Sequence, residues 1–217
     1  MGFLSDLKSQ AQALQQQHSG LQHDSAANVG ATDRAMGMAT RYLQELCAQL
    51  NVIRPPAVGD YSLDAKTAFG SLVLTGFRCD ARKKWHQNQE VFSHIGVGWD
   101  IGPAAGKPLH QQVSVNFPPD LERVTQRLSA GQVVHERKEV RHPDTQKLRS
   151  YVFEYEAQAQ GTVMVTGDHD KGEVTFRLAG VGGLVVSHAT YPATSVGAGL
   201  LDELAKKLVG QPSAFGA

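Results

Sequence analysis

The residues best suited to metal chemistry lie together in the last third of the chain. Asp168, His169 and Asp170 place two carboxylates and an imidazole at three consecutive positions, and such groups ligate divalent metals. They directly precede Lys171 and Gly172, and Asp, His and Gly are also common at the solvated tip of a hairpin. No second pair of ligands has a comparably tight spacing. We therefore expect a hairpin turn and predict no metal site.

The densest basic stretch combines cations with a tryptophan, as a surface for single-stranded nucleic acid would. It consists of Arg78, Arg82, Lys83, Lys84, Trp85 and His86. The alternative is a solvated hairpin loop between the first two strands, where Asp80 and Glu90 offset the positive charge. The whole chain carries 21 basic and 21 acidic residues, so no global field attracts a polyanion. We favour the loop and do not expect nucleic acid as a partner.

The remaining candidates for catalysis form no known motif. His94 and His110 fall in neighbouring expected strands and could meet across the ladder, although polar pairing on a wet face explains them equally well. Ser195 lacks the Gly-x-Ser-x-Gly setting of an activated serine, and the glycine-rich runs lack the setting of a phosphate loop. The sequence therefore predicts no catalytic residue and no cofactor. The alternative is an enzyme whose site brings His94, His110 and Asp168 together from separate strands.

The chain contains two cysteines, Cys47 and Cys79. They fall in an expected helix and an expected strand rather than in a disulfide framework, which indicates a reducing compartment. The start of the sequence has no basic leader followed by an apolar run, and no segment approaches the roughly 20 apolar residues that span a bilayer. We therefore expect a cytoplasmic protein without membrane insertion.

Between about Phe69 and Tyr191 the apolar residues recur with a period of two, which is typical of an antiparallel sheet with one wet face. Turn residues between the runs favour hairpins, so consecutive strands are expected to be neighbours. The pattern predicts strands at about 70–78, 90–101, 109–117, 133–141, 148–157, 162–168, 173–179 and 184–191.

Helices are expected around and within this run of strands. One at about 121–129 interrupts the strands and one at about 196–209 follows them. Two more precede them, one over about the first 20 residues and one at about 32–51, before a pair of prolines. The prediction is an α+β fold: a curved antiparallel sheet of seven or eight strands with an N-terminal two-helix unit, one interrupting helix and a C-terminal helix. Residues 1–54 would form the helical unit and residues 55–217 the sheet domain.

The first expected helix has a narrow apolar stripe, with Leu4, Leu7, Leu14 and Leu21 on one side and glutamines on the others. Because a free helix of under three heptads is marginal in water, the stripe needs another surface to pack on. We therefore expect a non-enzymatic protein that associates with itself or another protein through these leucines. The alternative is a carrier that holds a small apolar ligand or lipid in a cup between the curved sheet and the C-terminal helix.

Overall fold

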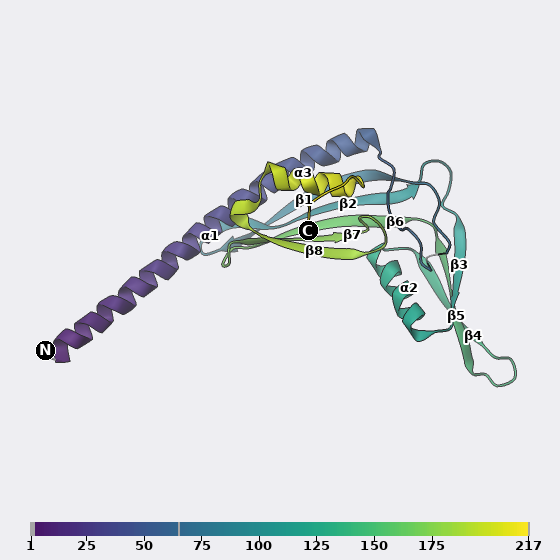
Figure 1. Cartoon of the computed structure of the whole chain (residues 1–217), viewed down its shortest axis with the longest axis horizontal. Helices are drawn as coiled ribbons and strands as arrows, with labels where there is room; N and C mark the ends of the chain where they lie inside the picture. The colour runs from purple at the N-terminus through teal and green to yellow at the C-terminus, as the bar shows by residue number, and fades with distance from the viewer. Residues whose placement is uncertain (1–2, 65, 217) are drawn as a thin grey trace.

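In the computed structural model the backbone is described for residues 3–64 and 66–216, and side chains for residues 25–64 and 66–216. Helices and strands follow one another along the chain as shown in Figure 1. Their bounds are α1 Phe3–Ile53, β1 Leu72–His86, β2 Gln89–Pro103, β3 His110–Val115, α2 Pro118–Ala130, β4 His135–Arg141, β5 Leu148–Glu156, β6 Ala159–Asp168, β7 Glu173–Ala179, β8 Val186–Pro192 and α3 Ala198–Leu208.

Within the described residues the strands form two antiparallel sheets, one ordered β1-β2-β6-β7-β8 and one ordered β3-β5-β4. The predicted α+β class is confirmed, but a single curved sheet with consecutive neighbours is wrong. β2 pairs with β6, ending with Ile101 opposite Ala159. This pairing occupies the second edge of β2, so β3 pairs with β5 instead.

α1 is one continuous helix of 51 residues, so the predicted N-terminal two-helix unit is wrong. The expected break lay between about residues 22 and 31, where Asn28 and Gly30 are weak helix formers. That segment contains no proline, and three alanines within it favour helix, so the helix continues. It ends just before Arg54, which has a left-handed φ of 49° and is followed by two prolines.

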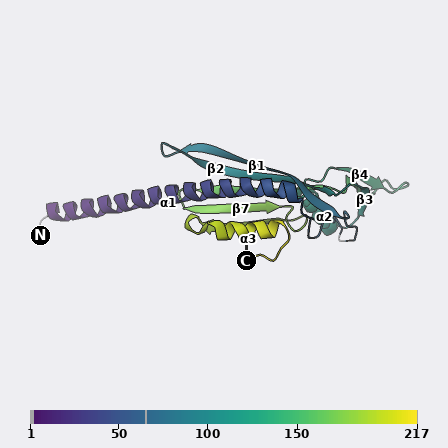
Figure 2. The same cartoon turned by 90° about the horizontal axis from the view of Figure 1, so that it is seen from above.

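The C-terminal half of α1 and the whole of α3 cover one face of the five-stranded sheet (Figures 1 and 2). The Tyr42 hydroxyl joins the two helices by donating to Asp202 Oδ1 at 2.6 Å. One hydrophobic core joins α1, the sheet and α3, and it includes Leu201 and Leu204 of α3. The residues of α1 that are buried here are Val29, Thr32, Ala35, Met36, Ala39, Thr40, Leu43, Cys47 and Leu50.

Asn51 fixes the register of α1 on β1. Its side-chain amide donates to the carbonyl oxygen of Phe77 at 2.9 Å and accepts from the backbone N–H of the same residue at 2.8 Å. The Phe77 ring stacks on Trp99 with centroids 5.5 Å apart. Gly161 lies opposite Trp99 on β6, and a Cβ there would overlap the indole ring. The close approach of β6 to this buried ring therefore requires glycine.

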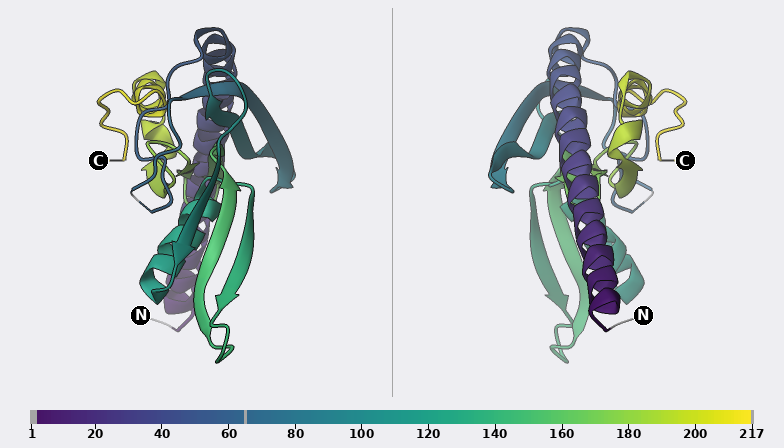
Figure 3. Two further views of the ribbon diagram at one scale, coloured as in Figure 1. Left: turned by 90° about the vertical axis from the view of Figure 1, so that its right-hand side faces the viewer. Right: turned by 90° about the vertical axis from the view of Figure 1, so that its left-hand side faces the viewer.

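The N-terminal half of α1 extends beyond both sheets. Figures 1 and 2 show this purple part of the helix running away from the strands, and Figure 3 shows it from both ends of the molecule. We call residues 3–24 the overhang and the rest of the described chain the body. At about 1.5 Å per residue the overhang is about 33 Å long. The three-stranded sheet and α2 lie at the opposite end of the body (Figure 1).

Candidate interaction site at the base of the overhang

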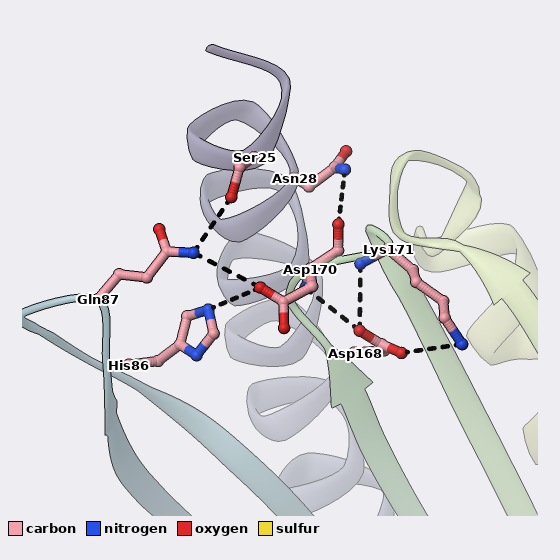
Figure 4. Close-up of polar contacts among 7 residues, drawn as sticks. All are labelled: Ser25, Asn28, His86, Gln87, Asp168, Asp170 and Lys171. Atoms are coloured by element: carbon pink, nitrogen blue, oxygen red, sulfur yellow. Dashed lines mark hydrogen bonds and ion pairs between the residues drawn. The ribbon is translucent and has the colours of Figure 1, made fainter. Parts of the chain in front are cut away.

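Three elements meet where the overhang leaves the body: α1, the tip of the β1–β2 hairpin and the turn between β6 and β7 (Figure 4). The two hairpins contribute polar side chains from their tips, and α1 contributes them from the middle of its length. We call this region the junction, and it comprises Ser25, Asn28, Thr32, His86, Gln87, Asp168, His169, Asp170 and Lys171.

The β1–β2 hairpin reaches α1 through a two-residue tip. Gln87 and Asn88 have φ values of 47° and 64°, as a type I′ turn requires at both central positions. The Gln87 side-chain amide donates to Ser25 Oγ at 3.1 Å and to Asp170 Oδ1 at 3.5 Å. One glutamine thus links this hairpin to both the helix and the neighbouring turn.

The β6–β7 turn is shaped by Asp168. Its Oδ1 accepts the backbone N–H of Asp170 at 3.2 Å and that of Lys171 at 3.1 Å. The hydrogen bond from Lys171 is the main reason why the pKa of Asp168 lies below its usual value. Gly172 completes the turn with a φ of 71°, and Asn28 of α1 donates to the Asp170 carbonyl at 3.0 Å. The hairpin turn predicted here is confirmed, and Asp168 is the residue that shapes it.

His169 lies inside the junction, so the expectation that it is solvated is wrong. It is 2% exposed, and neither ring nitrogen has a hydrogen-bond partner among the described residues. Its ring faces that of His86 at a centroid distance of 5.6 Å, and the buried hydroxyl of Thr32 also lacks a partner there. Burial, followed by the charges of Lys84 and His86, lowers the pKa of His169. An unpaired buried polar group costs about 1–3 kcal/mol, so these unpaired atoms reduce the stability of the packing around His169.

The acidic and imidazole groups of the junction make contacts other than metal ligation. Asp168 accepts the backbone N–H groups of its own turn, and Asp170 Oδ1 lies 3.3 Å from His86 Nε2. Within the described ranges, no group of three or more His, Cys, Asp or Glu side chains is placed to hold a metal ion. These polar side chains join neighbouring elements to one another where the overhang begins.

The predicted interaction residues Leu4, Leu7, Leu14 and Leu21 all belong to the overhang. Their side chains lie outside the described residues, so the contacts of these leucines stay a prediction. The helical backbone that carries them is described, and it runs clear of the strands (Figure 1).

The other candidate catalytic residues are dispersed over the fold. His94 lies in β2 opposite Thr166, whereas His110 lies in β3 opposite Glu156. The suggested meeting of these two histidines is therefore wrong, because the partner strands place them in different sheets. Ser195 ends the short 3-10 helix that precedes α3.

The basic stretch lies within β1, so the loop predicted for it is wrong, although most of its side chains are exposed to solvent as expected. β1 continues as far as the two-residue tip because β2 pairs with it up to His86 and Gln89. Arg82 pairs with Asp80 at 3.1 Å and Lys83 with Glu90 at 3.2 Å, so acidic residues offset the positive charge as expected. Trp85 is 76% exposed beside them.

A contact between the two cysteines was missed from the sequence. Cys47 of α1 and Cys79 of β1 are free thiols close enough to shift each other's pKa. This contact and burial raise the pKa of Cys47, whereas the contact lowers the pKa of Cys79. No local spacing signals the contact, because it depends on the register that Asn51 and Phe77 set between helix and strand.

A groove of about 820 Å³ lies at the other end of the body, between α2 and the start of β8. Its lining includes Val185 and Val186, which are 50% and 40% exposed. Arg123 and Arg177 also line it. The groove combines exposed apolar surface with three arginines and one acidic residue, Glu122.

Comparison of the chain with protein-family models, curated proteins and solved structures found no match. The helices of the described part of the chain are too short or too polar to cross a membrane.

Proposed function

We propose that this protein is a non-enzymatic interaction or assembly protein that associates with a second copy of itself through the overhang. One observation carries the proposal. The C-terminal half of α1 is buried against the body up to Leu50, whereas its N-terminal half extends past the strands for about six turns (Figure 1). The overhang carries a narrow apolar stripe and runs clear of the strands, so a partner surface that covers the stripe would stabilise it.

The composition of the overhang favours a like partner. Its only formal charges are Asp6, Lys8 and Asp24, so two copies would approach without strong repulsion. Its leucines and glutamines give the narrow apolar seam of a two-stranded coiled coil. The seam spans under three heptads, and a weak, concentration-dependent dimer is therefore expected.

Light scattering coupled to size-exclusion chromatography tests the proposal on the full chain. The wild type is expected to move from monomer to dimer as its concentration rises. Leu7→Gln combined with Leu14→Gln should hold the protein as a monomer, since glutamine keeps the helix propensity but removes the apolar seam.

The matched control is Gln12→Ala combined with Gln16→Ala, on the opposite side of the same helix. These changes should leave the dimer intact because they do not touch the seam. A wild type that stays monomeric at all concentrations would overturn self-association and leave a different protein as the occupant. A dimer that survives the leucine substitutions would show that the overhang is not the interface.

A carrier of a small apolar ligand or lipid is the second candidate, and the groove between α2 and β8 favours it. The region under α3 offers less room, because Leu201, Leu204 and Phe215 are buried there in the core. Native mass spectrometry with a fatty acid as probe tests this function. Retention by the wild type and loss in Val186→Asp would support it, and no retained fatty acid would count against it.

A further inference from the structure

The apolar stripe of the overhang is in line with the stripe of α1 that the sheet buries. Ten turns of an α-helix contain about 36 residues, which places Leu7 in line with Leu43 and Leu14 in line with Leu50. Leu43 and Leu50 are both buried against the body. The stripe of the overhang is therefore on the side of the helix on which, further along, the strands lie.

This alignment limits how a second helix can lie along the overhang. If it ran in the same direction, its continuation past residue 24 would enter the space that the hairpin tips and strands of the first copy occupy (Figures 1 and 4). If it ran in the opposite direction, its continuation would leave the first body, and each body would lie beyond the start of the other helix. Only the second arrangement avoids a collision between backbones.

We infer that two copies pair their overhangs antiparallel, so that each helix begins at the junction of the other copy. The inference rests on the proposed function and adds the direction and register of the interface. The two-fold axis would cross the helices between residues 12 and 13, with position 4 opposite position 21 and position 11 opposite position 14. Leu4 of one copy then faces Leu21 of the other at both ends of the seam, while Leu7 lies opposite His18 and Leu14 opposite Ala11.

At each end of this interface the positive end of one helix dipole would meet acidic groups of the other copy, although Asp6 in the same first turn offsets part of this attraction. The first turn of α1 carries the positive end of the helix dipole, and in this arrangement it arrives near Ser25 of the partner copy. The exposed carboxylate of Asp170 lies there, close to Gln87. Burying the seam would also bring the start of each helix against polar groups that can hydrogen-bond to it.

Disulfide trapping tests the direction of pairing. Copies with Leu4→Cys are mixed with copies with Leu21→Cys, both in a Cys47→Ala and Cys79→Ala background, and are oxidised with glutathione disulfide. In each reaction two protein thiols are oxidised to one disulfide, and one glutathione disulfide is reduced to two glutathione thiols. The 4–21 link is expected in about ten-fold excess over 4–4 and 21–21 links, since proximity sets the effective concentration.

The outcomes separate this inference from the proposed function. Dominant 4–4 or 21–21 links would overturn antiparallel pairing while leaving a dimer through the overhang. Absence of all three links in a mixture that is dimeric by light scattering would overturn the whole arrangement. A monomer with all native residues would remove the proposed function itself. If the background variant does not fold, the same mixture with both native cysteines is read by mass spectrometry of the disulfide-linked peptides.

Discussion

Single leucine substitutions along the same stripe of α1 separate the part of the helix that stabilises the body from the part that associates. Leu43 is 0% exposed in the core, so Leu43→Ala removes buried contacts and leaves a cavity. The expected loss in the free energy of unfolding is about 3 kcal/mol. For a chain of this size that loss lowers the Tm by about 6–12 °C.

Leu14 is in line with Leu50 on the same helix but belongs to the overhang. In a dissociated chain Leu14→Ala should cost less than about 0.5 kcal/mol, because alanine has a high helix propensity and no packed neighbours are lost. At concentrations that favour the dimer the same substitution should lower the Tm, since association stabilises the folded state by mass action. The effect of Leu14→Ala should therefore shrink on dilution, whereas that of Leu43→Ala should not.

Thermal melts followed by circular dichroism, at two protein concentrations about a hundred-fold apart, measure both effects. The reasoning is refuted if Leu14→Ala lowers the Tm as much as Leu43→Ala at both concentrations. The overhang would then be packed on its own body. A loss below about 1 kcal/mol for Leu43→Ala would instead refute the burial of the α1 stripe.

Two further predictions concern the titration of buried groups. Because burial lowers the pKa of His169, the unfolded chain binds a proton there more readily, and the free energy of unfolding should fall as the pH drops below about 6.5. Urea unfolding at about pH 7.5 and 5.5 should show a smaller loss in His169→Phe than in the wild type, and equal losses would contradict the assignment. Cys79, whose pKa is lowered by its contact with Cys47, should react with iodoacetamide at neutral pH well before Cys47 does. Peptide mass spectrometry over time checks this order, and equal labelling would argue against this contact.

Local pattern was sufficient to predict most elements of the fold. β7 has the predicted bounds, Glu173–Ala179, because buried Val174, Phe176 and Leu178 alternate with more exposed neighbours. The helix stripe of α3 was equally clear, since Leu201, Leu204 and Leu208 recur at helical spacing and are all buried. Both signals are strong because one face of each element is dry.

What the sequence did not predict depends on contacts between distant segments. Asn28 and Gly30 suggest a break in α1, yet Asn28 is held by the turn at Asp170, and the helix passes through. His169 occupies a turn, where side chains are usually solvated, but α1 and the β1–β2 hairpin cover it. The contacts of the stripe from Leu4 to Leu21 stay a prediction, because the side chains of this segment lie outside the described residues.

The antiparallel pairing of β2 with β6 has a consequence for how the chain reaches its fold. Because Ile101 and Ala159 are partners, the chain departs from the five-stranded sheet and returns to it at one place, and the second sheet and α2 form a closed detour between them. Loop-closure entropy rises only slowly with loop length, so lengthening or trimming the exposed β4–β5 hairpin of this detour would add little to the cost of joining the two halves of the main sheet. Evolution or design could therefore remodel that hairpin while the platform that supports α1 keeps its shape.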